Sequence, residues 1–242
     1  MTKQALIAAG GFGTRMSSNL NITNNKSLIK YAGQTMIGHL IDSLKDGGIK
    51  KFVFSTGNHN YKEIRDIVKS KNINSVVVPY QESNGYRFIP YIWQDLLDDQ
   101  FLFACGHHPL SSNLVRKMIQ ASNKTDCVIT AYDNSVYPID KQNEILYSGT
   151  KFKPLLNSVD TKLHKIDPNH FYVRNPYVVK KSLIWLAEKE HFKYSFSYYI
   201  YMHWKLTKSL SVIKTSIPPE FDYDYEYEKT KVFLDNYLAL DI

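Results

Sequence analysis

Short apolar runs and amphipathic stretches alternate along the first third of this 242-residue chain. The apolar runs at 4–9, 50–57 and 73–79 are typical of buried strands. Between them, residues 36–48 and 60–70 carry apolar side chains three and four positions apart, which indicates helices. Strands separated by helices pair in parallel through right-handed crossovers, and ligands bind beyond the carboxyl ends of such strands. The alternation predicts an α/β fold, a three-layer α/β/α sandwich with a mostly parallel central sheet.

The rest of the chain continues the pattern less regularly. We expect strands that end near Gly106, around 128–132, at 170–176 and at 210–215, the third of them closed by Pro176. We expect helices at 111–122, 177–189, 194–205 and 225–238, and irregular backbone from 134 to 169. A chain of this length is an ordinary size for one α/β domain, so we expect a single domain over 1–242.

The composition fits a folded globule without a membrane segment. Hydrophobic residues make up 43% of the chain, which is enough for a sizeable core. No apolar stretch approaches the roughly 18 residues that span a bilayer, and the first apolar run is too short for a secretory signal. Cys105 and Cys127 lie inside apolar runs, which favours reduced thiols packed in a core. We therefore expect a cytoplasmic protein with no membrane partner.

The net charge of +7 points to an anionic partner. Nucleic acid, an anionic membrane surface and phosphorylated small molecules all remain open on charge alone. Lysines alternate with aromatic residues at 193–208, a composition that could stack bases and pair phosphates. At helical spacing, however, such aromatic residues more often form a core or a contact between subunits. We expect no nucleic-acid partner, and a homodimer is one arrangement that would bury these side chains.

Three glycines directly follow the first apolar run. Backbone N–H groups can surround phosphate oxygens only where no Cβ blocks the approach, and Gly10, Gly11 and Gly13 meet that need. Arg15 adds a charged fork that suits phosphate, and Lys26 adds a second cation. The segment is not a P-loop, because residues 13–15 read Gly-Thr-Arg where glycine, lysine and serine or threonine are needed. A dinucleotide fingerprint fails too, since its third glycine would stand at Met16 and no acidic residue ends the second strand.

The two strings "LIAAGGFGTRM" and "NKSLIKYAGQTMIGHLIDSLKDGGIKKFVFSTG" together resemble the opening of the nucleotidyltransferase family. This family includes the sugar-phosphate nucleotidylyltransferases and the MobA-like NTP transferases, which have a GT-A-like fold. Its members open similarly to "LAAGxGTRM", followed by a lysine and a leucine. The resemblance implies transfer of a nucleotidyl group from a nucleoside triphosphate to a sugar phosphate or similar alcohol phosphate, with release of pyrophosphate. It also implies a nucleotide-binding half at 1–133 and an acceptor-binding half at 134–242.

The resemblance further implies a role for individual residues and a divalent metal cofactor, Mg²⁺ or Mn²⁺. Arg15 and Lys26 are the expected catalytic cations. The expected nucleotide-binding residues are Ala9, Gly10, Gly11, Gly13 and Thr14 for the phosphates, and Gln81 and Gly85 for the base. The segments "FKP" and "NHFYVRNP" are similar to acceptor-binding segments of the family, which implies contacts from Lys153 and Asn169. "FDYDYEYE" is similar to a segment that carries a metal-binding carboxylate, here Asp222.

One residue departs from the family pattern at the expected metal site. Where the family has glycine followed by aspartate, this chain has Gly106 followed by His107. Mg²⁺ prefers oxygen ligands, whereas imidazole suits manganese, cobalt or zinc. His107, alone or with His108, could bind such a metal together with Asp222, or Mg²⁺ could be held mainly by Asp222 and the triphosphate. In a third reading the chain is a catalytically impaired nucleotide-binding or regulatory domain.

Overall fold

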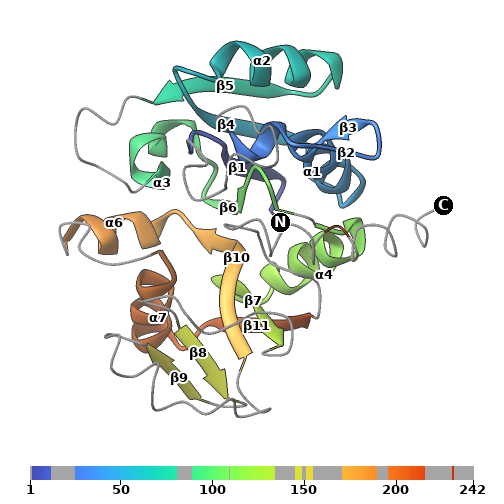
Figure 1. Cartoon of the computed structure of the whole chain (residues 1–242). Helices are drawn as coiled ribbons and strands as arrows, with labels where there is room; N and C mark the ends of the chain where they lie inside the picture. The colour runs from blue at the N-terminus through green and yellow to red at the C-terminus, as the bar shows by residue number, and fades with distance from the viewer. Residues whose placement is uncertain are drawn as a thin grey trace, which may run out of the picture. The chain divides into compact units, whose positions relative to one another are not determined.

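The computed structural model describes residues 2–11, 25–80, 89–108, 110–133, 145–148, 151–154, 171–189, 196–215 and 231 (Figure 1). The chain divides into two compact units, each built from separate segments. Unit 1 comprises Met1–Thr2, Gly85–Leu102 and Lys117–Ser216, and unit 2 comprises Lys3–Asn84, Phe103–Arg116 and Ile217–Ile242. Among the described residues, no helix has the length and apolar character that crossing a bilayer requires.

Unit 2 is built on parallel strands. Strands β1 (Gln4–Ala8), β4 (Lys51–Gly57) and β5 (Ser75–Tyr80) pair in that order, and β6 (Gln100–Cys105), which begins in unit 1, lies on the other side of β1. The β1–β4 and β4–β5 pairs are both parallel. Leu6, Ile7 and Phe54 are fully buried, as expected for strands covered on both faces. The predicted α/β class with a mostly parallel sheet is confirmed.

Helix α1 (Met36–Asp46) forms where the apolar spacing predicted a helix, and it has a cap that was not predicted. Thr35 caps its first turn by accepting a hydrogen bond from the N–H of Gly38 at 3.2 Å. The helix ends at two glycines for two different reasons. A Cβ at Gly47 would lie 2.3 Å from a side-chain carbon of Val115 on α4 (Ser112–Ser122), and Gly48 has a φ of +108°. Helix α2 (Tyr61–Ser70) is the second predicted helix of this unit.

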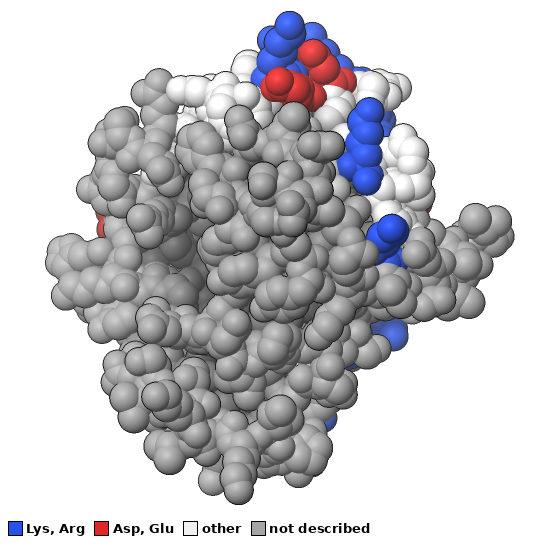
Figure 2. Space-filling model, in the orientation of Figure 1, with Lys and Arg blue, Asp and Glu red and all other residues white. Residues whose placement is uncertain are grey.

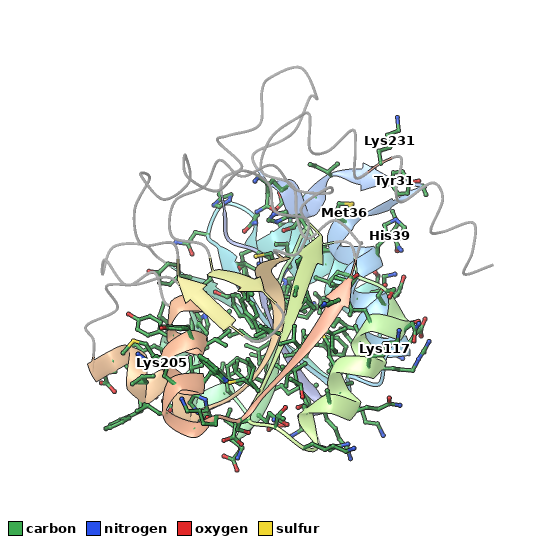
Figure 3. The ribbon with its side chains drawn as sticks, turned by 90° about the horizontal axis from the view of Figure 1, so that it is seen from below. Tyr31, Met36, His39, Lys117, Lys205 and Lys231 are labelled. Atoms are coloured by element: carbon green, nitrogen blue, oxygen red, sulfur yellow. The ribbon has the colours of Figure 1, made fainter. Side chains whose placement is uncertain are left out.

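A hairpin of strands β2 (Lys30–Tyr31) and β3 (Gln34–Thr35) precedes α1 and was not predicted. His39 on α1 holds it, because its Nε2 donates to the Tyr31 carbonyl at 2.8 Å (Figure 3). Since a carbonyl only accepts, the proton is on Nε2, and Nδ1 accepts from the Gln34 side chain at 3.0 Å. Gln34 also contacts Asp42, and Lys71 donates to both of them. The hairpin is thereby fixed to both helices.

Unit 1 contains a mixed part of the sheet. β7 (Cys127–Asp133) pairs in parallel with β11 (Leu210–Thr215) and antiparallel with β10 (Phe171–Lys180). β8 (Ile145–Ser148) and β9 (Lys151–Pro154) form a hairpin on β10, in a segment predicted to be irregular. Among its described residues, this unit has the helices α3 (Ile89–Ile92), α6 (Ser182–Lys189) and α7 (Phe196–Thr207), the 3-10 turn η4 (Gln94–Leu96) and the last turns of α4.

The prediction that a strand ends at Pro176 and a helix begins at residue 177 is wrong. β10 continues to Lys180, with a register shift against β7 between Arg174 and Tyr177. The shift accommodates the proline, which has no N–H to give to a ladder. Side chains of β7 satisfy the carbonyls there, since Thr130 donates to Pro176 O at 3.1 Å and Tyr132 donates to Asn175 O at 2.8 Å.

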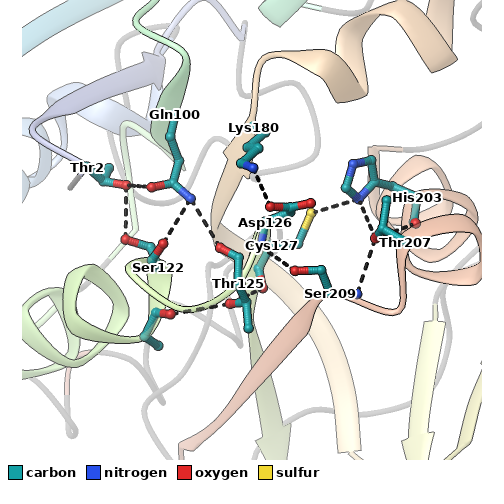
Figure 4. Close-up of polar contacts among 11 residues, drawn as sticks. Thr2, Gln100, Ser122, Thr125, Asp126, Cys127, Lys180, His203, Thr207 and Ser209 are labelled. Carbon is teal, nitrogen blue, oxygen red and sulfur yellow. Dashed lines mark hydrogen bonds and ion pairs between the residues drawn. The ribbon is translucent and has the colours of Figure 1, made fainter.

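Polar side chains form a continuous network within unit 1 (Figure 4). Thr2 Oγ1 donates to Gln100 Oε1 at 2.6 Å, and Lys180 forms an ion pair with Asp126. Cys127 Sγ lies 3.5 Å from His203 Nδ1. Burial, followed by the charge of Asp126, raises the pKa of Cys127 to about 12, so this thiol stays protonated and is a packing residue, as the sequence predicted.

The buried imidazole of His203 makes the folded chain sensitive to acid. Burial lowers the pKa of His203 from 6.5; the charge of Asp126 opposes this shift and that of Lys180 adds to it. As the pH falls below 6.5, the unfolded chain takes up a proton that folded His203 refuses, so stability is lost. We expect a lower urea midpoint at pH 5.5 than at pH 7.5, and a smaller difference in His203→Gln. An equal pH difference in both proteins would contradict this assignment.

Candidate functional site

Three segments of unit 2 meet at the carboxyl ends of β1 and β6. The N–H of Gly106, directly after β6, donates to Ala8 O at 2.8 Å. A Cβ at Gly106 would lie 2.5 Å from Ser27 Oγ and 3.0 Å from the Cβ of Ala9. This close packing brings the start of the glycine loop, the segment around Lys26 and the strand end before His107 into contact. The structure therefore groups Ala9, Gly10, Gly11, Lys26 and His107, five of the residues predicted for the site.

The first two loop glycines differ in what surrounds them. A Cβ at Gly10 would lie 2.9 Å from Gly57 N and 3.0 Å from Thr56 C, so Gly10 allows the loop to pack on the backbone of β4. A Cβ at Gly11 would meet no atom within 4 Å in the described part of the chain. Gly11 is also exposed. Gly10 thus has a structural role, whereas the backbone of Gly11 borders open space that a ligand can enter.

Lys26 is 8% exposed and begins the 3-10 turn η2 (Lys26–Leu28). Asn25 caps this turn, because its Oδ1 accepts a hydrogen bond from Ser27 N at 2.8 Å. The low exposure excludes the interpretation of Lys26 as a solvated loop lysine. A lysine in this turn, which Asn25 links to the glycine loop, supplies positive charge near the place where a phosphate would bind.

Two buried asparagines hold the carbonyl groups of the glycine loop. Asn25 Nδ2 donates to Ala9 O at 2.8 Å and to Gly11 O at 3.0 Å. Asn60 Nδ2 donates to the same Ala9 O at 2.7 Å, and Asn60 Oδ1 accepts from Gly57 N at 2.9 Å. Each asparagine is 2% exposed. No local sequence pattern marks either contact, because asparagine is common in loops for many reasons.

The two histidines after β6 have different surroundings. His108 is 0% exposed, whereas His107 is partly exposed. Of the two, only His107 therefore has solvent-accessible surface. In the described ranges no group of three or more His, Cys, Asp or Glu side chains could hold a metal ion. Asp222, the carboxylate predicted to bind the metal together with His107, lies outside the described residues.

The other predicted site residues are not part of the described group at the ends of β1 and β6. Lys153 lies on β9 in unit 1. Seven predicted site residues lie outside the described ranges: Gly13, Thr14, Arg15, Gln81, Gly85, Asn169 and Asp222. Their roles stay predictions.

The surface of α2 carries both positive and negative side chains. Figure 2 shows blue and red atoms intermingled at the top of the view, over α2. This helix alternates lysine and arginine with acids, and Arg65 Nε lies 3.7 Å from Asp66 Oδ1. An uninterrupted basic surface of the kind that binds nucleic acid is absent from this helix.

Comparison with known proteins decides the family. Residues 5–166 match the profile of the MobA-like NTP transferase domain. The chain belongs to the MobA-like NTP transferase family. Members of this family bind a nucleoside triphosphate and a sugar or alcohol phosphate, and they generally use a divalent metal ion.

Individual relatives agree with this family. The chain is 26% identical over 123 residues to the bifunctional IPC transferase and DIPP synthase of Aquifex aeolicus, covering 50% of this chain. It is 28% identical over 135 residues to the bifunctional protein GlmU of Staphylococcus haemolyticus, covering 54% of this chain. The matched region spans only 28% of the length of either relative. The structure of the inositol-1-phosphate CTP transferase from T. maritima superposes with a TM-score of 0.70 at 15% identity, over 97% of both chains. The fold is therefore the α/β nucleotidyltransferase fold.

Proposed function

We propose that this MobA-like NTP transferase joins a nucleoside triphosphate to a phosphorylated sugar or alcohol and releases pyrophosphate. The observation that carries the proposal is the grouping of Ala9–Gly11, the buried Lys26 and His107 at the ends of two neighbouring strands. N–H donors and a cation in one place suit the phosphate tail of a nucleotide. The names of two similar proteins, an IPC transferase and an inositol-1-phosphate CTP transferase, support the proposal.

In this reaction an oxygen of the acceptor phosphate attacks the α-phosphorus in line, and the bond to the leaving pyrophosphate breaks. Positioning and charge stabilisation dominate such a step, so no nucleophilic serine or cysteine is needed. The loop of Gly10, Gly11, Gly13 and Thr14 binds the β- and γ-phosphates. Lys26 stabilises the charge that develops on the α-phosphate, and Arg15 stabilises the departing pyrophosphate.

The remaining predicted residues complete the proposed site. Gln81 and Gly85 contact the base, and Lys153 and Asn169 contact the acceptor. His107 and Asp222 would hold the divalent ion, which offsets phosphate charge when bound. An imidazole beside the loop fits Mn²⁺ better than Mg²⁺. We further propose one cytoplasmic domain over 1–242, with a nucleotide half at 1–133 and an acceptor half at 134–242, that can form a homodimer.

A pyrophosphate-release screen tests this function directly. Purified protein is incubated with ATP, CTP, GTP, UTP or dTTP and a panel of sugar 1-phosphates, inositol 1-phosphate and phosphocholine, with Mg²⁺ and separately with Mn²⁺. We expect pyrophosphate from at least one pair only when both substrates are present. Absence of pyrophosphate from every pair would contradict an active enzyme.

The presence of His107 in place of aspartate favours one alternative, a catalytically impaired nucleotide-binding or regulatory domain. Such a domain would be stabilised against heat by a nucleoside triphosphate, because a ligand of the folded state raises the unfolding temperature. It would release no pyrophosphate. The two measurements together separate the alternatives.

Substitution of His107 by aspartate tests its role at the metal. A carboxylate is a harder ligand than imidazole, so we expect His107→Asp to raise Mg²⁺-supported activity relative to Mn²⁺-supported activity by about tenfold. The measurement is kcat/KM with each ion, and His107→Asn is the neutral control. An unchanged ratio in His107→Asp would argue against metal binding at this position.

A further inference from the structure

We infer that Asn25 and Asn60 are positioning residues that orient the glycine loop toward the phosphates. Their Nδ2 groups donate hydrogen bonds to the carbonyl oxygens of Ala9 and Gly11, and we call this pair of side chains the amide clamp. The inference rests on the proposed function, because it assigns the clamp to nucleotide binding at that site.

The geometry of the peptide bond gives the clamp its effect. In a trans peptide the C=O and the following N–H point in opposite directions. Two donors, at 2.8 and 2.7 Å, hold Ala9 O against the buried asparagines, so the N–H of Gly10 faces away from them. Within the described part of the chain, the N–H groups of Gly10 and Gly11 donate no hydrogen bond. Among the described residues, none competes with a ligand for these two groups.

The loop needs such a clamp because glycine is permissive. A glycine peptide can flip at small steric cost, and a flipped unit would present a carbonyl oxygen to the phosphate in place of an N–H. Carbonyl oxygens and phosphate oxygens repel each other. A clamp that holds two carbonyls inward before the ligand arrives reduces the ordering that binding requires.

The same side chains connect the loop to the rest of the site. Asn25 Oδ1 caps the turn that begins with Lys26, while its Nδ2 holds the loop. Asn60 Oδ1 binds Gly57 N at the end of β4, while its Nδ2 holds the loop. Each amide therefore has a structural acceptor and a positioning donor, and the two functions can be separated by mutation.

Asparagine-to-aspartate substitution separates them. Asn25→Asp and Asn60→Asp keep the oxygen that accepts from the backbone N–H and replace the donor by an oxygen that repels the carbonyl. Asn58→Asp, at an exposed position two residues from Asn60, is the control for added negative charge. Asn25→Ser and Asn60→Ser remove the amide donor without adding charge. The substrate pair is the one with the highest wild-type turnover in the screen above.

We expect the KM for the triphosphate to rise about tenfold in Asn25→Ser, which loses two donor contacts, and about threefold in Asn60→Ser, which loses one. The double variant should exceed the product of these factors, because only then does Ala9 O lose both donors. The kcat should change less than the KM. The aspartate variants should show larger effects than the serine variants, and Asn58→Asp should match the wild type. Triphosphate Kd, measured by calorimetry, should follow the KM.

Each outcome has one meaning. Serine and aspartate variants with wild-type KM and Kd, or with a lowered unfolding temperature but an unchanged KM, would overturn the clamp and leave the proposed function intact. If Asn58→Asp raised the KM as much as Asn60→Asp, the added negative charge would explain the effect, and the proposed role of the clamp would be wrong. A wild type that neither binds a triphosphate nor releases pyrophosphate would overturn the proposed function and the clamp with it.

Discussion

Replacement of Lys26 by alanine or methionine is expected to lower kcat for pyrophosphate release by about 100-fold to 1000-fold. Lys26 is 8% exposed and begins a turn beside the glycine loop, and a charge with little access to water is weakly screened. Methionine keeps most of the length of the side chain and removes the ammonium group, so the turn should be retained. The measurement is initial rate with saturating substrates, together with the unfolding temperature.

The exposed Lys30, four residues along the chain, is the matched control. Lys30→Met removes the same charge from the same segment and should leave kcat within about twofold, because a solvent-exposed charge is screened. If Lys26→Met turned over like the wild type, Lys26 would have no part in the chemistry. Equal losses in both variants would point instead to the net charge of the segment.

Gly10→Ala and Gly11→Ala should affect different properties: the first lowers stability, and the second lowers nucleotide affinity. Gly10→Ala forces a Cβ to within 2.9 Å of Gly57 N, and backbone atoms cannot move aside easily. We expect a loss of about 2 kcal/mol in the free energy of unfolding, typical of overpacking, and a Tm lower by roughly 6 °C. Gly11→Ala meets no described atom within 4 Å, so its stability should change by less than about 0.5 kcal/mol.

For triphosphate affinity, Gly11→Ala should be the more harmful of the two substitutions. A methyl group on Gly11 would occupy the open space where a phosphate approaches, so triphosphate affinity should fall about tenfold in a fully folded protein. Calorimetry on Gly11→Ala and thermal unfolding of both variants check the pair. A stable Gly10→Ala would contradict the close packing, and wild-type affinity in Gly11→Ala would move the phosphate away from Gly11.

The sequence predicted the regular parts of the fold because their signals are local. Strand β1, the apolar face of α1, the two glycines that end it, and strand β11 all lie within a few residues of their predicted bounds. The meeting of the glycine loop with Lys26 and His107 was also predictable, since parallel strands end at the same edge.

Other features depend on contacts that are distant in sequence. Tyr177, Val178 and Val179 suit a strand or a buried helix equally, and only pairing with β7 across the register shift makes them a strand. The hairpin of β8 and β9 has strands of only four residues each, too short for a clear period. Asn60 reaches Ala9 across 51 positions, and no local pattern marks such a partner.

Asn25 stands where related sequences commonly have another residue, and it changes how the glycine loop is held. The nucleotidyltransferases that this chain resembles commonly have proline before the loop lysine. Asn25 has a φ of −158°, which a proline ring near −65° cannot adopt. Proline would also lack the amide that holds two carbonyls here. The chain therefore fixes its loop by side-chain hydrogen bonds in place of ring rigidity.

The tight fit around Gly106 has a consequence for evolution. Any larger residue there would collide with Ser27 and Ala9, whether or not the neighbouring groups ever touch a nucleotide. A descendant that had abandoned catalysis would still retain this glycine, while the adjacent histidine position would be free to drift. A glycine kept at position 106 in other members of the family would therefore indicate only that the fold is kept. A residue kept at position 107 would indicate that the reaction requires it.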